Sequence, residues 1–311
     1  MDLKDLKCVV AIAEMGSFIR ASERLNMSQP SVSARIRTLE AKFGVQLFTR
    51  NARGIQITQE GEDLLRHAQL ILRQVKNAEA DMTAYRSSPV GLVLVGLPTS
   101  LTARLSAPLL ERCMAEMPHV KLRIVESMSG YITRWLCDEV LDIGITFGSS
   151  APPNIDAEPL AREDLLLVAK SASDLASLTD EDGEVPFTRL SDVQLILPGP
   201  EHGLRTLIEG QARQQAVDIR VVVEIDSFGE IKRLVSMGFG YTIMSSAAFY
   251  YGFGPDLSAA TIGKPAISRV VNLAMLAGGG QSRATKEVAR CLRETIRTKT
   301  DGEKWFARAI G

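Results

Sequence analysis

The sequence predicts an α/β protein made of a small, mostly helical N-terminal head, one long helix, and a larger body of two α/β lobes. Residues 3–43 carry apolar positions at three- and four-residue spacing, the period of amphipathic helices. Residues 58–88 keep that period without interruption. The remainder alternates short apolar runs with helical stretches, which is typical of sheets covered by helices.

Composition separates the head from the body. The chain has 311 residues, of which 45% are hydrophobic, so it can bury a sizeable core and form about two domains. The net charge is −1, but residues 1–58 hold nine Lys and Arg against five Asp and Glu, hence +4, which leaves −5 for the rest. A basic head on an acidic body indicates that the head meets a polyanion.

Several classes of protein are excluded at this stage. No apolar run reaches the roughly 18 residues that span a bilayer, and the start lacks the features of a signal peptide, so we expect a cytoplasmic protein with no membrane partner. The four cysteines are widely spaced, which favours reduced thiols over disulfides or a zinc site. No metal and no cofactor are expected.

The head begins with three predicted helices. The first covers residues 3–15 and stops at Gly16, and the second covers 18–25 after the capping residue Ser17. The third begins at Pro30, whose missing N–H is harmless in a first turn, and ends before Gly44. Its inward face is predicted to comprise Val32, Ile36, Leu39 and Phe43; its outward face, Pro30, Ala34, Arg37 and Thr38.

Two short strands follow, at 45–50 and 55–58, joined by a polar turn at 51–54. Three helices and a two-stranded wing are the parts of a winged helix-turn-helix, whose third helix enters the major groove of DNA. Residues 1–58 are therefore predicted to bind double-stranded DNA. The candidates for base contacts are Gln29, Ser31, Ser33 and Arg37, beside Pro30; those for phosphate contacts are Lys42, Arg50 and Arg53, while Arg35 fits either role.

Residues 59–88 are predicted to form a linker helix. Apolar residues recur in alternating steps of four and three, a heptad pattern typical of paired helices: Leu64, Ala68, Ile71, Val75, Ala78, Met82 and Tyr85. We expect a homodimer through this helix, with dimers able to pair into a tetramer. The alternative is that the row packs on the chain's own body.

Residues 89–311 form the predicted body, with lobe I over 89–162 and 267–300 and lobe II over 163–266. Strands are expected at 92–96, 120–126, 142–147, 165–169, 194–197, 221–225, 241–244 and 270–277. Helices are expected at 103–116, 132–138, 204–215, 230–237 and 284–297. The alternation favours parallel sheets, and residues from 300 onward are expected to be a frayed tail.

The head closely resembles the N-terminal signature of LysR-type transcriptional regulators. The matching residues are Ser17, Phe18, Ala21, Leu25, Ser28, Gln29, Pro30, Ser31, Val32, Ser33, Ile36, Leu39, Glu40, Gly44, Leu47, Phe48, Arg50, Thr58 and Gly61. The segment 95–100 also resembles the branch that contains nitrogen assimilation control proteins. The chain departs from the family at Ala34, where arginine is frequent. The resemblance implies a periplasmic-binding-protein-like effector domain, pairing through the linker helix, and contact with RNA polymerase.

The body contains a predicted effector cleft. Small ligands of α/β sheets sit beyond the carboxyl ends of strands, where helix N-termini bind anions. The resemblance maps the effector-contacting loops of the family onto such segments, and the candidates there are Thr99, Ser100, Ser129, Phe147, Gly199, His202 and Ser227. The three serines fit equally well as ordinary helix caps. The effector is a small molecule whose identity the sequence leaves open.

The sequence favours a regulator over an enzyme. Its three histidines have no metal-binding spacing, and neither a nucleophile elbow nor a phosphate-binding loop is present. The alternative from another class is a solute-binding or transport protein, since the body resembles one. That alternative requires a signal peptide and has no use for residues 29–37.

Overall fold

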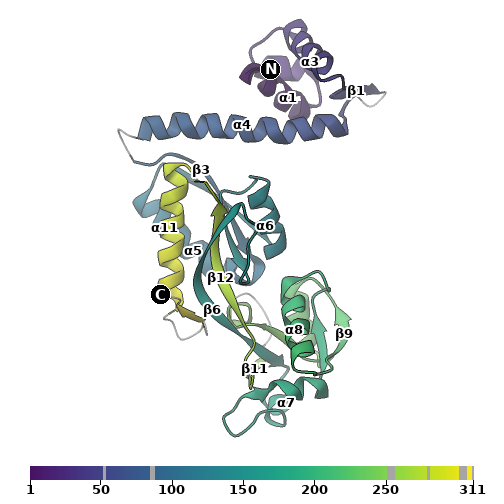
Figure 1. The fold of residues 1–311 in the computed structure, drawn as a ribbon, viewed down its shortest axis with the longest axis vertical. Helices are drawn as coiled ribbons and strands as arrows, with labels where there is room; N and C mark the ends of the chain where they lie inside the picture. Colours follow the sequence, from purple (N-terminus) through teal and green to yellow (C-terminus); the bar gives the residue numbers. More distant parts are fainter. Residues whose placement is uncertain (52–53, 85–87, 251–255, 279–280, 301–306, 310–311) are drawn as a thin grey trace. The chain divides into compact units, whose positions relative to one another are not determined.

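The computed structural model describes residues 1–51, 54–84, 88–250, 256–278, 281–300 and 307–309 (Figure 1). The chain divides into two compact units, Met1–Ser87 and Ser88–Gly311. None of the helices in these described ranges combines the length and the apolar character needed to cross a membrane.

The head contains three helices with well-defined ends: α1 (Leu3–Met15), α2 (Phe18–Arg24) and α3 (Gln29–Phe43). Asp2, Ser17 and Ser28 cap their N-termini through side-chain oxygens, which accept hydrogen bonds from backbone N–H groups. Gly16 and Gly44 end α1 and α3 in the left-handed conformation, which glycine adopts without a steric penalty. The predicted helix boundaries in the head are confirmed to within a few residues.

The wing consists of β1 (Phe48–Asn51) and β2 (Gly54–Ile57), which pair antiparallel. The strand predicted from residue 45 begins only at Phe48, because the Glu40 carboxylate accepts hydrogen bonds from the N–H groups of Leu47 (2.8 Å) and Phe48 (3.3 Å) and holds the segment as a turn. The prediction that Phe43 points inward was wrong. Its side chain is 44% exposed in the last turn of α3.

The linker helix α4 (Gln59–Ala84) packs against the head at its N-terminal end. Thr58 caps it, since its hydroxyl accepts a hydrogen bond from the N–H of Gly61 at 3.0 Å. Gly61 lies so close to the wing that a Cβ placed on it would be 2.2 Å from the carbonyl oxygen of Leu47. Only glycine allows α4 to leave the wing at this angle.

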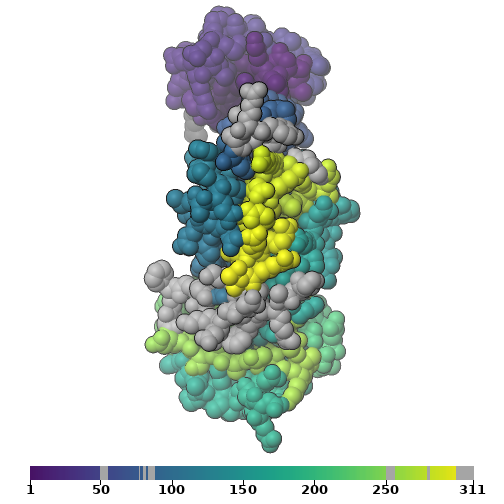
Figure 2. Space-filling view, turned by 90° about the vertical axis from the view of Figure 1, so that its left-hand side faces the viewer, coloured from purple at the N-terminus to yellow at the C-terminus, as the bar shows by residue number. Residues whose placement is uncertain are grey.

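Lobe I of the body is a three-layer α/β structure. Its parallel strands are β3 (Gly91–Pro98), β4 (Val120–Ser127) and β5 (Ile143–Phe147). Its main helices are α5 (Thr99–Glu116), α6 (Ser129–Cys137) and α11 (Arg283–Thr300). Figure 2 shows α11 lying alongside α5 on the surface of the lobe, where Arg112 and Glu294 form an ion pair. Apolar side chains of α5, α11 and the strands make one core.

Two strands connect the lobes (Figure 1). β6 (Ile155–Ala169) and β12 (Ser268–Leu276) run antiparallel beside each other, and β12 also pairs with β5. The prediction gave β6 only its last five residues, because the polar residues of its first half hide the period of a strand. The sheet is also mixed, not parallel as predicted, since the return of the chain through β12 makes an antiparallel pair inevitable.

Lobe II surrounds the other end of β6, where β10 (Thr242–Ser245) and β11 (Ser258–Gly263) pair antiparallel with it. The described part of lobe II also contains the short strand β7 (Val185–Pro186) and the parallel pair β8 (Gln194–Leu197) and β9 (Arg220–Glu224). Its helices are α7 (Ala172–Ala176), η1 (Phe187–Asp192), α8 (Gly203–Gln214), α9 (Phe228–Ser236) and α10 (Ser246–Tyr250). Lobe II has apolar cores of its own, but Ala247 of α10 packs into the core of lobe I.

The C-terminal segment corrects one prediction. Residues from 300 onward were expected to be a frayed tail, but β13 (Ala307–Ala309) pairs antiparallel with β6, with Ala309 opposite Ala161. The segment forms a strand because the backbone N–H and C=O groups along one edge of β6 supply its hydrogen-bond partners.

Replacement of Gly61 by alanine is expected to destabilise the head by about 1–3 kcal/mol, because the new methyl group meets the backbone of Leu47. Calorimetric unfolding of the full chain measures the effect. The matched control is Gly210→Ala on α8, where a Cβ meets nothing within 4 Å and the stability should rise by about 0.5–1 kcal/mol. Unchanged unfolding of Gly61→Ala would show that α4 leaves the wing differently.

Candidate functional site

The outward face of α3 presents a row of polar side chains at four-residue spacing: Gln29, Ser33 and Arg37. The Gln29 amide donates a hydrogen bond to the Ser33 hydroxyl at 2.9 Å, which fixes both side chains in place. Arg37 is exposed and forms no hydrogen bond or ion pair with any described residue. The row therefore offers an oriented amide beside a cation that has no internal partner.

Arg35, on the same helix, has a different role within the head. Its guanidinium contacts the carboxylates of Asp2 (3.2 Å) and Asp5 (2.5 Å) at the start of α1, and its side chain is only 29% exposed. The hydrogen bond to Asp5 raises the pKa of Arg35. The hydrogen bond from the Asp5 N–H, together with Arg35, lowers the pKa of Asp2. Arg35 thus ties α3 to α1, a function that the sequence left open.

The other predicted DNA-binding residues lie around this face. Pro30 and Ser31 are exposed in the first turn of α3, and the Ser31 hydroxyl accepts a hydrogen bond from Ser28 at 3.0 Å. Lys42 is exposed in the last turn, with its ammonium 5.8 Å from the centre of the Phe43 ring. Arg50 is on β1, opposite Ile55. The side chain of Arg50 and all of Arg53 lie outside the described residues.

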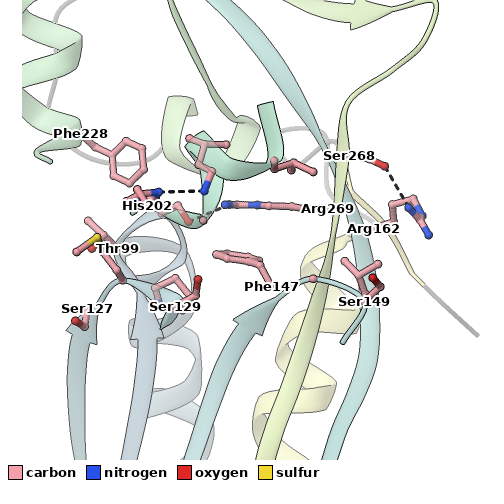
Figure 3. Close-up of a pocket in the computed structure, with 18 residues that line it drawn as sticks. Thr99, Ser127, Ser129, Phe147, Ser149, Arg162, His202, Phe228, Ser268 and Arg269 are labelled. Carbon is pink, nitrogen blue, oxygen red and sulfur yellow. Dashed lines mark hydrogen bonds between the residues drawn. The ribbon is translucent and has the colours of Figure 1, made fainter. Parts of the chain in front are cut away.

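The body contains a cavity of about 270 Å³ between its two lobes (Figure 3). Lobe I contributes the ends of β3, β4 and β5 with the first turns of α5 and α6. Lobe II contributes the first turns of α8 and α9, and the connecting strands β6 and β12 form one wall. The two lobes approach closely here, since a Cβ on Gly203 would be 3.8 Å from the Ser129 hydroxyl.

Five of the seven predicted effector residues line this one cavity: Thr99, Ser100, Ser129, Phe147 and His202. Gly199 and Ser227 lie in the same loops but do not line it. The Gly199 N–H donates a hydrogen bond to Asp226 at 3.0 Å, and the Ser227 hydroxyl caps α9 by accepting from Glu230 at 3.4 Å. Ser227 is therefore an ordinary helix cap, the alternative that the sequence left open for this residue.

Sequence reasoning missed the cationic part of the cavity, Arg162 on β6 and Arg269 on β12. The Arg162 guanidinium donates a hydrogen bond to the Ser268 hydroxyl at 3.2 Å, at the rim. The sequence did hold a clue to Arg269, because the strand predicted from residue 270 connects the two lobes and so had to pass the cavity. Its start was placed two residues too late, and Arg269 was left in an unassigned loop.

Arg269 is 7% exposed and joins several elements. Its Nε donates to the fully buried Glu163 carboxylate at 2.9 Å, and its Nη2 donates to the Ser100 hydroxyl at 3.0 Å. The guanidinium carbon lies 3.5 Å from the centre of the Phe147 ring, a cation–π contact visible in Figure 3. Glu163 also accepts a hydrogen bond from the Ala247 N–H at 3.4 Å.

His202 faces Arg269 from lobe II (Figure 3). Its Nδ1 accepts a hydrogen bond from the Leu204 N–H at 3.1 Å and so caps α8, while its ring meets the Phe228 ring edge-on at 5.9 Å. Burial, with the charge of Arg269 added, lowers the pKa of His202. The neutral imidazole is therefore the favoured form, and it serves as an acceptor for the backbone.

The chemistry of the cavity is that of binding. Hydroxyl groups, two arginines and aromatic rings surround a space large enough for one small molecule. In the part of the chain that the structure describes, no group of three or more His, Cys, Asp or Glu side chains is arranged to hold a metal ion.

Two family models match the chain and together cover most of it. Residues 3–62 match the bacterial regulatory helix-turn-helix protein of the lysR family. Residues 86–297 match the LysR substrate binding domain. The first match sets aside a solute-binding or transport protein, which has no use for such a head.

Curated relatives and solved structures agree. The chain is 29% identical over 294 residues to the nitrogen assimilation regulatory protein of Klebsiella aerogenes, covering 93% of this chain and 94% of the relative. It is 32% identical over 248 residues to the HTH-type transcriptional regulator CfxR of Cupriavidus necator, covering 79% and 76%. The fold resembles a full-length OxyR variant from Pseudomonas aeruginosa (TM-score 0.72, 22% identity, 98% and 97% covered) and CbnR in complex with target DNA (0.68, 20%, 96% and 99%).

His202 is expected to make stability depend on pH near neutrality. Because its pKa is lowered in the folded chain, the unfolded chain takes up a proton first, and stability falls as the pH drops below about 6.5. His202→Gln keeps an acceptor for the α8 cap but does not titrate, so its melting temperature should fall less between about pH 7.5 and 5.5. The control is His119→Gln, at an exposed site. An equal fall in the melting temperature of the wild type, His202→Gln and His119→Gln would contradict the assignment of the pH dependence to His202.

Proposed function

The chain belongs to the LysR family of bacterial transcriptional regulators, and from that membership we propose how its own residues perform the function. It binds DNA through a helix-turn-helix and carries an effector-binding domain; it is not an enzyme. The proposed mode is a homodimer that places two copies of α3 in successive major grooves of an interrupted palindrome. As a DNA-binding regulator it acts in the cytoplasm and in contact with RNA polymerase.

The observation that carries the DNA-binding mode is the face of α3. Arg37 is exposed, without an internal partner, and in line with the Gln29–Ser33 pair, so its guanidinium is free to contact guanine, while the amide suits adenine. Ser31, beside Pro30, extends this base-reading set. Lys42, Arg50 and Arg53 are proposed to contact phosphates and to fix the register of the head on the duplex. Arg35 is proposed to hold α3 in place through Asp2 and Asp5, without reading bases.

The linker helix is proposed to pair with its copy in a second chain, as the heptad row predicts. Leu64, at its start, packs against the core of its own head, and Ala68 is buried. Further along, Ile71 is 39% exposed and Met82 is 64% exposed, so the row continues without cover from the head. Exposed apolar residues at heptad spacing are what a helix-to-helix seam uses. Tyr85, the last member, lies outside the described residues.

The effector is proposed to bind in the cavity between the lobes, with Thr99, Ser100, Ser129, Phe147 and His202 as contacts. Since both lobes line this space, a ligand can bind one lobe arrangement more tightly than another and shift the population toward it. In a dimer that shift changes the spacing of the two heads on DNA. Gly199 and Ser227 are proposed to support the loops rather than to touch the ligand.

Arg37→Ala should weaken binding to a specific site by about 1–3 kcal/mol, because one base contact is lost. Lys42→Ala should weaken binding to all DNA sequences alike, and it should reduce the slope of log affinity against log salt concentration by about one. Fluorescence anisotropy with the promoter fragment of the protein's own gene and with a scrambled duplex, over a range of salt concentrations, separates the two effects. Unchanged promoter affinity in Arg37→Ala would overturn the proposed reading of α3.

Ile71→Glu should weaken dimerisation at least about tenfold, because it buries an unpaired charge in the proposed seam. Gln69→Glu adds the same charge at an exposed position of α4 outside the apolar row and is the matched control. Sedimentation equilibrium of both variants measures the dissociation constant. A dimer that tolerates both substitutions equally would place the interface elsewhere.

A further inference from the structure

The lining of the cavity is one-sided in charge. Two arginines, Arg162 and Arg269, line it, whereas no Asp or Glu is among the described lining residues. The nearest buried carboxylate, Glu163, is fully enclosed behind Arg269 and is held there by the Arg269 Nε and by the Ala247 N–H. A ligand in the cavity therefore meets the cation before it meets the carboxylate.

Arg269 keeps one donor uncommitted. Its Nε and Nη2 donate hydrogen bonds to Glu163 and Ser100, while its Nη1 donates none to any described residue. The side chain is more than nine-tenths buried and extends into the cavity above Phe147 (Figure 3). Nη1 itself is not enclosed by protein atoms, so a ligand or water in the cavity can accept its hydrogen bond.

Two helix N-termini are aimed at the same space. α5 and α6 begin after Pro98 and Met128, whose side chains form no capping hydrogen bond. By contrast, a side chain caps the N-terminus of each of the helices α1, α3, α8 and α9. The first-turn N–H groups of an uncapped helix carry a partial positive charge that favours an anion. Thr99 and Ser129, which open these two helices, both line the cavity.

We infer that the effector is a small monocarboxylate with a flat apolar skeleton, whose carboxylate lies between Nη1 of Arg269 and the first turns of α5 and α6. This inference rests on the proposed function of the cavity and names the chemical class of its ligand. The apolar part of the ligand faces Phe228 and Leu207 of lobe II. Arg269 is then the residue that determines specificity for an anion.

The charge and size of the site limit the ligand further. Arg162 and Arg269 bring two positive charges to the cavity, and the buried Glu163 carboxylate that bonds Arg269 offsets one of them, which leaves 2 − 1 = +1. A doubly charged phosphate ester would therefore leave its second charge uncompensated in a poorly hydrated site. A cavity of about 270 Å³ is at the lower end for ligand sites and suits a single ring. Burial is the main cause that lowers the pKa of His202, and the positive charge of Arg269 lowers it further.

The test compares matched ligands on the full-length protein. The probes are benzoate, nicotinate and furan-2-carboxylate, each beside its primary amide, with phenyl phosphate as the dianion; calorimetry gives the affinities. The carboxylates are expected to bind at least about tenfold more tightly than their amides, which is the size of one charge-assisted hydrogen bond. Amides or phenyl phosphate binding as well as the carboxylates, or no carboxylate binding at all, would overturn the inference.

A double variant, Glu163→Gln with Arg269→Gln, tests the anchor without changing the net charge. It should lose the preference for carboxylate over amide, whereas Arg134→Gln, at an exposed position of α6 outside the cavity, should keep it. A retained preference in the double variant would assign the anion to other donors. The wild-type comparison stands by itself if the double variant does not fold.

The same wild-type protein is also tested for promoter DNA without ligand. A protein that binds its promoter but prefers amides overturns only the monocarboxylate. A protein that binds no promoter, either alone or with the carboxylates present, overturns the proposed function.

Discussion

The body depends on one buried ion pair, that of Glu163 with Arg269. Both charges have left water, which costs several kcal/mol per ion unless hydrogen bonds replace the lost hydration. Here Arg269 bonds Glu163 and Ser100, and Glu163 also accepts from Ala247. The two residues face each other in the β6–β12 register. A slip of one residue would turn Arg269 to the other face of the sheet and leave Glu163 buried without a cation.

This constraint sets the geometry between the lobes. β6 and β12 run through both lobes, and their buried side chains belong to the apolar cores of both, so the two strands join these cores. Arg269 lies on β12 and bonds Ser100, in the first turn of α5. A ligand that contacts Arg269 and the first turn of α5 would therefore touch a connecting strand and lobe I at the same place.

Sequence reasoning located the local features and lost the long-range ones. The head helices are confirmed because caps and glycines act on their immediate neighbours, and five cleft residues were found because they end strands or open helices. The first half of β6, the strand at 307–309 and Arg269 were missed, since each depends on a partner far along the chain. Phe43 was misplaced because a helical period continues to the last turn, even where the core no longer covers it.

The arginines of both units follow one physical rule. A guanidinium has five N–H donors, so it can hold the fold with some and leave others for a partner molecule. In the head the two tasks fall to different residues: Arg35 is taken up by Asp2 and Asp5, whereas Arg37 has no described partner. In the cavity one residue carries both, because Nε and Nη2 of Arg269 hold the register while Nη1 stays uncommitted. Loss of Arg37 should thus spare the fold, whereas any change at Arg269 alters binding and architecture together.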